Sequence, residues 1–366
     1  MSKIDKYRYV QRDFVTKIQG EYIILLGQRT NGKSFAVKED LIKRALENDE
    51  EFAYIRRYKE DCKQYMVEEY FSDIICDKKG VRHLEEWTEG KYNTIVCYQA
   101  SIYFAYMDPE SGKTTRGQKL GRMFGLSWAT HYKSLSFPNI TTAVYEEFVT
   151  DEAYLENECK RFMNLISTIF RENKARVYLV GNTLSRINPF FSEWQLNNIN
   201  KQKPNSVELY HHHFKNEEEE ESTTTIAVYL THSTNFNSGM FFGNAAKSIT
   251  STTWETDEQP HLKRARGDFD LIYTMVFIYD RTLFLMEFLR DQAGNYTWFV
   301  SPKNTEIQKG TRIISNKYII DQKATMGFFP LSEGERTLFK YLMEDKIAYS
   351  DNLTGTEFKQ CYNMLR

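Results

Sequence analysis

One segment near the amino terminus constrains the fold of this chain more than any other. The apolar run at residues 22–26 is followed by the loop GQRTNGKS at residues 27–34, and then by apolar residues at helical spacing to about residue 46. Glycines at both ends let such a loop wrap around phosphate groups, and the amino terminus of the following helix favours an anion. The segment therefore predicts a strand–loop–helix unit of a parallel sheet, with a nucleotide-phosphate site at the sheet edge.

The loop also defines candidate nucleotide contacts. Lys33 can reach the β- and γ-phosphates of a bound triphosphate, and the Ser34 hydroxyl can bind Mg²⁺. We therefore expect ATP and Mg²⁺ as cofactors. The residues expected to form the nucleotide site are Gly27, Arg29, Thr30, Asn31, Gly32, Lys33 and Ser34.

A pair of carboxylates is the second candidate element of catalysis. Residues 141–145 predict a strand that ends in Glu146 and Glu147. Neighbouring side chains of a strand point to opposite faces, so the two glutamates can have different roles. We expect Glu146 to join the Mg²⁺ coordination sphere through water, and Glu147 to act as the general base toward the attacking water. The alternative is a solvated glutamate pair at the amino terminus of a helix.

Two polar residues follow other predicted elements. Asn182 comes just after a strand predicted over 176–180, where additional-strand P-loop ATPases carry a polar sensor between the acid pair and the γ-phosphate. A plain turn at the strand end is the alternative. Arg171 ends a helix predicted over about 151–171. Its side chain either caps the carboxyl end of that helix or reaches a neighbouring subunit's γ-phosphate as an arginine finger.

The order of predicted elements gives an α/β fold class with a second, smaller α+β domain. We assign residues 1–231 to an additional-strand P-loop ATPase domain with a parallel central sheet, which ends in a hairpin. Residues 232–260 are rich in Ser, Thr, Asn and Gly and predict a linker. Residues 261–366 show three alternating strands and then a helical pattern over 331–343, which predict the α+β domain.

The distribution of charge is more informative than its sum. Lys and Arg number 48 and Asp and Glu number 50, so the formal net charge is only −2. Residues 111–145 nevertheless contain no acidic residue. The cations of this stretch predict a local basic patch that suits a phosphate backbone. They are Lys113, Arg116, Lys119, Arg122 and Lys133.

Other features of the sequence indicate the cellular compartment in which the protein is expected. No apolar run approaches the roughly 20 residues that span a bilayer, so we expect no membrane association. The 5 cysteines show no CxxC spacing, which argues against a disulfide framework and a zinc ribbon. No export signal is visible at the amino terminus. These features together predict a soluble protein of a reducing cytosol.

The motifs occur in an order that resembles a known family. They are GxRxxGKS, FxYIRRYK, YKSLSFPNITTAVYEEF, NLISTIFR and GNTLSRINPFF, over residues 27–191. This order is similar to the DNA-packaging (encapsidation) ATPases of small, short-tailed, protein-primed bacteriophages, which are relatives of the large terminase. The resemblance implies an ATP-driven motor that packages double-stranded DNA. Such a motor is a homomeric ring, typically a pentamer, on the portal of the prohead in the host cytoplasm. Whether a structural RNA takes part stays open.

The same resemblance implies roles for individual residues. Arg171 becomes the arginine finger across a ring interface, and Arg57 and Lys59 become candidates for a positive charge acting between subunits. Arg29 becomes a phosphate sensor, and Lys133 a residue that faces the pore and touches DNA phosphates. Glu146 stands where such relatives can have Asp, which leaves open how closely it approaches the ion.

Large terminases carry an RNase H-like nuclease in their second domain. The resemblance therefore implies an RNase H-like fold for residues 261–366, and the acidic residues there indicate whether a nuclease site is present. A two-metal nuclease needs several converging carboxylates, usually including one on the first strand. That strand, predicted over 271–279, contains no acidic residue. We therefore expect a vestigial nuclease-like domain without nuclease activity, with a basic approach at 261–266. The nearby acids are Asp268, Asp270, Asp280 and Asp291.

Other functions remain as alternatives at this point. A terminase with an active nuclease would use carboxylates that the pattern does not align. An ATP-gated assembly factor would bind nucleotide without translocating, and a small-molecule kinase would lack stimulation by DNA. A GTPase switch is disfavoured because the NKxD motif is missing, since Asn316-Lys317-Tyr318 is followed by Ile319.

Overall fold

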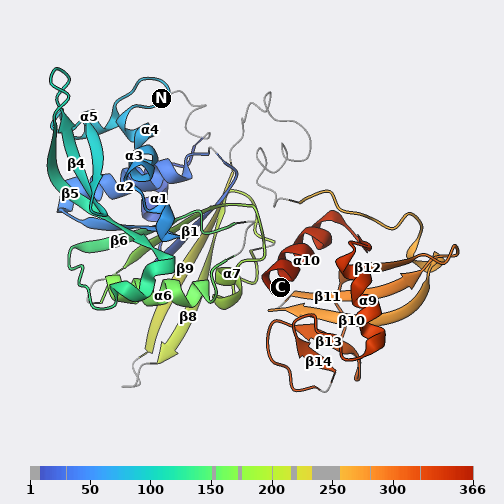
Figure 1. Cartoon of the computed structure of the whole chain (residues 1–366). Helices are drawn as coiled ribbons and strands as arrows, with labels where there is room; N and C mark the ends of the chain where they lie inside the picture. The colour runs from blue at the N-terminus through green and yellow to red at the C-terminus, as the bar shows by residue number, and fades with distance from the viewer. Residues whose placement is uncertain are drawn as a thin grey trace.

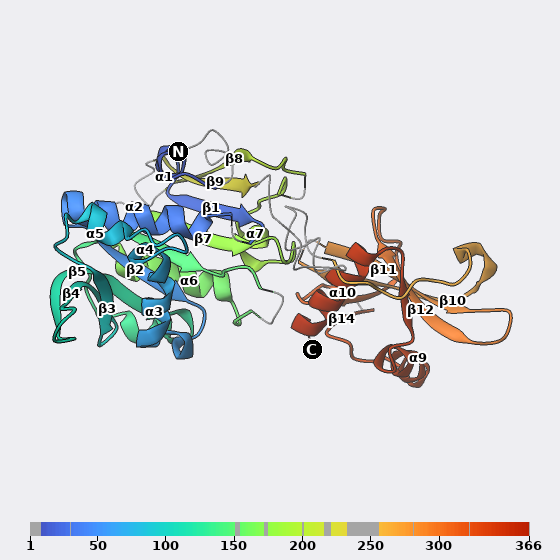
Figure 2. The same cartoon turned by 90° about the horizontal axis from the view of Figure 1, so that it is seen from above.

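The chain forms two lobes, each built on its own β-sheet (Figure 1). The structure is a computed structural model that describes residues 9–29, 31–150, 154–171, 175–199, 201–215, 221–232, 256–280, 282–321 and 323–365. Seen from above, the two lobes lie side by side (Figure 2). Within the described ranges, no helix has the length and apolar character needed to cross a membrane.

Among the described residues, the first lobe contains a nine-stranded sheet with the order β3-β4-β5-β2-β6-β7-β1-β9-β8. Six neighbouring strands of this sheet, from β5 to β9 in that order, run parallel. Strand β7 separates β1 from β6, which is the predicted additional-strand arrangement. The strands are β1 (Tyr22–Gly27), β2 (Glu51–Arg56), β3 (Thr94–Tyr98), β4 (Ser101–Met107), β5 (Thr114–Gly125), β6 (Ile140–Glu146), β7 (Arg176–Asn182), β8 (Ser206–Lys215) and β9 (Glu221–Thr231).

The parallel part of the sheet is buried on both faces because helices cover each side. Every residue of β1 is buried, and its alternate side chains enter two different hydrophobic cores. Helices α6 and α7 pack into one core, and the other core receives α1 to α5. The helices are α1 (Arg12–Lys17), α2 (Lys33–Asn48), α3 (Gln64–Tyr70), α4 (Ser72–Ile75), α5 (His83–Trp87), α6 (Glu158–Ile169) and α7 (Pro189–Glu193).

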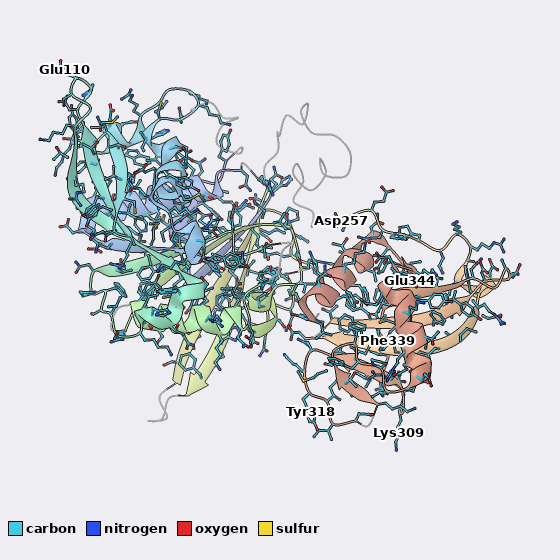
Figure 3. All side chains as sticks on the ribbon, in the orientation of Figure 1. Glu110, Asp257, Lys309, Tyr318, Phe339 and Glu344 are labelled. Carbon is cyan, nitrogen blue, oxygen red and sulfur yellow. The ribbon has the colours of Figure 1, made fainter. Side chains whose placement is uncertain are left out.

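An antiparallel extension of the sheet differs from the predicted pattern. Strands β3, β4 and β5 pair antiparallel at the sheet edge, and Glu110 lies at the tip of the β4–β5 hairpin (Figure 3). Strands β4 and β5 were not expected from the sequence. Glycine is disfavoured in strands, and β5 contains Gly117 and Gly121. A Cβ atom on Gly121 would lie 2.1 Å from the carbonyl oxygen of Phe52, so the close approach of β2 requires glycine there.

The second lobe has the strand order expected of an RNase H-like sheet. Among the described residues, six strands lie in the order β14-β13-β10-β11-β12-β15. The antiparallel meander β10–β11–β12 confirms the prediction, while β13 and β14 add in parallel beside β10. Helices α9, which carries Phe339 (Figure 3), and α10 pack into its core. The elements are β10 (Asp270–Tyr279), β11 (Thr282–Arg290), β12 (Tyr296–Pro302), β13 (Arg312–Ser315), β14 (Ala324–Met326), β15 (Ile347–Tyr349), α9 (Glu333–Met343) and α10 (Asn352–Leu365).

Direct contacts join the two lobes. The loop after β7 reaches α10, where Arg186 forms an ion pair with Glu357 at 2.7 Å and the Ser185 hydroxyl donates to Gln360 at 2.6 Å. The predicted linker at 232–260 lies mostly outside the described residues. The proposed domain boundaries at 231 and 261 therefore stay predictions.

Candidate functional site

The phosphate-binding loop connects β1 to α2 and is tied to the end of β9. Gly27 has a φ of 148°, and a Cβ atom there would lie 2.1 Å from the Thr231 hydroxyl oxygen, so only glycine fits. Asn31 donates its side-chain amide to that same hydroxyl at 2.5 Å. Arg29 is exposed, and Thr30 lies outside the described residues. The loop is thus held in shape by a neighbouring strand of the sheet.

Lys33 is buried at the centre of this loop. Its ammonium donates to the carbonyl oxygens of Gln28 at 2.7 Å and Gly27 at 3.1 Å, and to the side-chain oxygens of Asn31 at 3.2 Å and Asn182 at 3.4 Å. Burial lowers the pKa of Lys33 to about 7, although the charge of Glu146 opposes this shift. A phosphate group at this position would favour the charged ammonium. The arrangement brings Asn182, the predicted sensor at the end of β7, next to Lys33.

Ser34 and Glu146 come together as candidate metal ligands. The Ser34 hydroxyl donates to Glu146 Oε2 at 3.3 Å, across 112 residues of sequence. Glu146 is buried, and this burial raises its pKa, while hydrogen bonds from Tyr70 and Ser34 act in the opposite direction. Hydroxyl and carboxylate oxygens are the donors that Mg²⁺ prefers. The two side chains therefore fit a Mg²⁺ site beside the phosphate-binding loop.

Glu147 has a different environment from Glu146. Its backbone is in the left-handed region, with a φ of 55°, and its side chain is 65% exposed. The carboxylate forms an ion pair with Arg56 at 2.8 Å, and Arg56 is the last residue of β2. The adjacent glutamates thus differ in burial and partner, because β6 ends at Glu146 and the backbone turns at Glu147. In this structure the expected general base, Glu147, is therefore ion-paired with Arg56.

Arg57 is a buried residue of the first lobe. We expected this residue to act between subunits, but the structure places its guanidinium inside the lobe, paired with the fully buried Glu158 at 2.9 Å. Arg57 also donates to the carbonyl oxygens of Glu147 and Phe148, at 3.3 Å and 2.9 Å. Tyr145 donates its hydroxyl to Glu158 at 2.8 Å. Arg57 therefore fixes the backbone on the carboxyl side of the glutamate pair, and a trans role would first require this ion pair to break.

The effect of removing Arg57 on stability distinguishes these roles. We expect Arg57→Ala to lower the free energy of unfolding by about 3–5 kcal/mol, because it leaves the buried Glu158 carboxylate unpaired. Arg161→Ala, at a half-buried arginine of α6 that donates to the Glu156 carbonyl oxygen, serves as the control; it leaves no buried charge unpaired and should change the free energy of unfolding by about 1 kcal/mol or less. Urea denaturation measures both. A fully stable Arg57→Ala protein that loses only activity would restore the inter-subunit role.

The remaining predicted cations lie at the surface. Lys59 is exposed, and its ammonium lies 3.9 Å from the ring centroid of Trp128. Trp128 belongs to a 3₁₀ helix, η3 (Leu126–Tyr132), that leads directly into the exposed Lys133. Arg171 lies just past α6, and its guanidinium donates to the carbonyl oxygen of Lys133. This contact is outside its own helix, so the structure joins the predicted finger to the predicted DNA-contacting loop.

The basic patch predicted for residues 111–145 is more dispersed than expected. Lys119 forms an ion pair with Glu51 at 2.5 Å, and the Arg116 guanidinium lies 4.3 Å from the ring centroid of Tyr98. Lys113 lies in the hairpin between β4 and β5, whereas Lys133 follows η3. The antiparallel extension separates these cations, and its strands were not recognised from the sequence.

Several residues of the site were missed by the sequence analysis. Arg56 directly precedes Arg57 in the motif FxYIRRYK and is the last residue of β2, and its position at a strand end was the available signal. Thr231 is a polar residue at the end of β9, and this position was the signal that could have identified it. Tyr70, which donates to Glu146 at 2.9 Å, gave no local signal because it is 76 residues away in sequence.

The acids at the two ends of β10 have partners nearby, and β10 begins one residue earlier than predicted, so that Asp270 is its first residue. Asp270 pairs with Arg290 at 2.8 Å, and Asp280 accepts from Asn316 and pairs with Lys317, each at 3.0 Å. Over the part of the chain that the structure describes, no cluster of three or more His, Cys, Asp or Glu side chains suits a metal ion. The absence of nuclease activity remains a prediction.

The fold and the site define the class of this protein. The first lobe is an additional-strand P-loop domain. It has a parallel sheet in which β7 lies between β1 and β6, a GxxxxGKS loop after β1, and Glu146 at the end of β6. A smaller lobe with the strand order of an RNase H-like sheet follows it. This combination is the one expected from the resemblance to packaging motors related to the large terminase.

Comparison with known proteins supports a particular branch of that class. Residues 116–214 match the family described as Podovirus DNA encapsidation protein (Gp16). The DNA packaging protein of Bacillus phage B103 is 32% identical over 171 residues, which cover 46% of this chain and 46% of that protein. The DNA packaging protein of Bacillus phage phi29 is 29% identical over 171 residues, covering 46% and 44%. The resemblance inferred from the motifs is therefore confirmed.

The whole chain also has a solved structural counterpart. It superposes on a chain of the bacteriophage phi29 viral genome packaging motor assembly with a TM-score of 0.56 and 17% identity, covering 98% of this chain and 99% of that one. At this identity the likeness shows the shared fold of both lobes. The sequence matches, in contrast, span less than half the length of the curated relatives.

Proposed function

We propose that this chain is an ATP-driven translocase that packages double-stranded phage DNA into a prohead. The observation that carries the proposal is the convergence of Lys33, Ser34, Glu146 and Asn182 at one edge of a parallel sheet. The similarity to DNA packaging proteins over 171 residues supports the choice of DNA as substrate. We infer a homomeric ring, most simply a pentamer, that docks on the portal in the host cytoplasm.

The proposed hydrolysis divides its tasks among these residues. Lys33 binds the β- and γ-phosphates, with Asn182 next to its ammonium. Ser34 would bind Mg²⁺ and Glu146 would hold it through water, and the bound ion would neutralise phosphate charge. Glu147 leaves Arg56 and takes the proton of the attacking water as general base. Because Glu147 is largely exposed, its site suits completion by a neighbouring subunit.

We further propose that Arg171 completes the site of a neighbouring subunit. An arginine finger adds positive charge where the transferred phosphoryl group becomes most charged. Its contact with the Lys133 carbonyl supports a link between the finger and the DNA loop, since displacement of that loop would free the guanidinium. Lys59, which is also exposed, remains a second candidate for a positive charge between subunits.

DNA contact through Lys133 gives the test of the proposed function. We expect Lys133→Ala to leave basal ATP hydrolysis nearly unchanged, because the residue is exposed and remote in sequence from the phosphate loop. Duplex DNA should stimulate this variant less, and the slope of log affinity against log salt should fall by about 1 per lost phosphate contact. ATP hydrolysis and DNA binding over a salt series measure these effects.

The matched control is Lys340→Ala, an exposed lysine of α9 in the second lobe. It removes the same charge from another surface and should preserve DNA stimulation. Equal stimulation of wild type, Lys133→Ala and Lys340→Ala would contradict a DNA contact at Lys133. A wild type that hydrolyses ATP but never responds to DNA would favour the small-molecule kinase or the assembly factor.

A further inference from the structure

Tyr70 makes a contact with the candidate metal site that the proposed mechanism does not use. It is the last residue of α3, and its hydroxyl donates to Glu146 Oε1 at 2.9 Å. The Ser34 hydroxyl donates to the other oxygen, Oε2, at 3.3 Å. The two oxygens of one carboxylate are therefore held by different groups. Oε1 is fixed by the phenol, and Oε2 faces Ser34.

The ring of Tyr70 is itself held on several sides. The Lys38 ammonium lies 4.8 Å from the ring centroid and donates to the Tyr70 carbonyl at 2.7 Å and to Asp73 at 2.5 Å. The ring of Tyr54, on β2, packs against it with a centroid separation of 4.7 Å. Such contacts leave the hydroxyl little freedom to turn away from Glu146.

Lys38 connects this arrangement to the phosphate-binding loop. It lies four residues after Ser34 in α2, so both side chains project from the same face of the helix. Lys38 is buried, as is Glu146. The helix that follows the phosphate loop thus holds Tyr70 with one side chain and faces Glu146 with another.

We propose that Tyr70 is a positioning residue for Mg²⁺, because its hydrogen bond orients the Glu146 carboxylate so that Oε2 is presented beside Ser34. Groups that orient a metal-binding carboxylate contribute strongly to metal affinity, and their loss typically weakens it 10- to 100-fold. The inference rests on the proposed function, which requires Mg²⁺ and ATP to bind at this site. It adds a residue of α3 to a site otherwise built from β1, α2, β6 and β7.

The experiment compares Tyr70→Phe with Tyr65→Phe in the full chain. Tyr65 lies on the same helix and is 56% exposed, so its variant removes a hydroxyl that faces solvent. Binding of a non-hydrolysable fluorescent ATP analogue is measured while MgCl₂ is titrated. For Tyr70→Phe we expect the Mg²⁺ concentration at half-maximal enhancement to rise at least about tenfold. Metal-free analogue binding and the melting temperature should stay as in wild type.

Three results would contradict the proposed role of Tyr70. A Mg²⁺ dependence of Tyr70→Phe equal to that of wild type and Tyr65→Phe would overturn the inference. So would a joint loss of metal-free binding and of the melting temperature, because it would make Tyr70 a packing residue only. If the wild type binds the analogue without any dependence on Mg²⁺, the proposed metal site fails, and the role of Tyr70 fails with it.

Discussion

Glu147→Gln is expected to reduce ATP turnover at least about 100-fold while leaving ATP binding intact. A positioned general base contributes roughly 10²- to 10⁴-fold to a reaction of this kind, and glutamine has the same shape without the basic oxygen. Lys33, Ser34 and Glu146, which we expect to bind the nucleotide and Mg²⁺, are unchanged by the substitution. Turnover at saturating ATP and equilibrium binding of a fluorescent ATP analogue separate the two effects.

Glu156→Gln provides the matched control. It makes the same change on an exposed glutamate in the loop before α6, and its turnover should equal that of wild type. Loss of analogue binding in Glu147→Gln would show that Glu147 serves binding rather than proton transfer. Undiminished turnover would assign the general base to another residue.

Arg171→Ala is expected to lower turnover about 10³-fold or more in the assembled ring, which is the typical contribution of an arginine finger. The two inactive variants, Arg171→Ala and Glu147→Gln, should recover part of the wild-type turnover when they are mixed. In the mixed ring, a Glu147→Gln subunit still offers its Arg171 to a neighbour that has retained Glu147. Mixing at varied ratios, with turnover as the readout, measures this complementation.

Two results would contradict a finger that acts between subunits. One is the absence of recovery in mixtures that sedimentation shows to form rings. The other is equal loss in Arg161→Ala, the half-buried arginine control on α6, because that would indicate a general effect of charge on this helix. A finger in cis would leave the mixture as inactive as its components.

Much of the first lobe could be predicted because its signals are local. The strand, loop and helix of the phosphate site are consecutive in the chain, and so are the strand and the glutamate pair. Periodicity detects such elements directly. The different environments of Glu146 and Glu147 have another cause than the predicted strand alternation, because β6 ends at Glu146 and Glu147 has a left-handed backbone.

What could not be predicted depends on contacts that are distant in sequence. The ion pair of Arg57 with Glu158 joins residues 101 positions apart, and the hydrogen bond of Tyr70 to Glu146 spans 76. Neither partner is recognisable from its neighbours. Strand β5 was missed for another reason. Close packing against β2 requires glycine at position 121, and glycine in a sequence argues against a strand.

The central claim is that ATP hydrolysis at this site moves double-stranded DNA, and the rate of ATP hydrolysis with and without duplex DNA tests it most directly. The account predicts turnover by the wild type that duplex DNA increases, and no turnover above background by Lys33→Ala in either condition. Wild-type protein that hydrolyses no ATP with or without DNA, or Lys33→Ala protein as active as wild type, would contradict it.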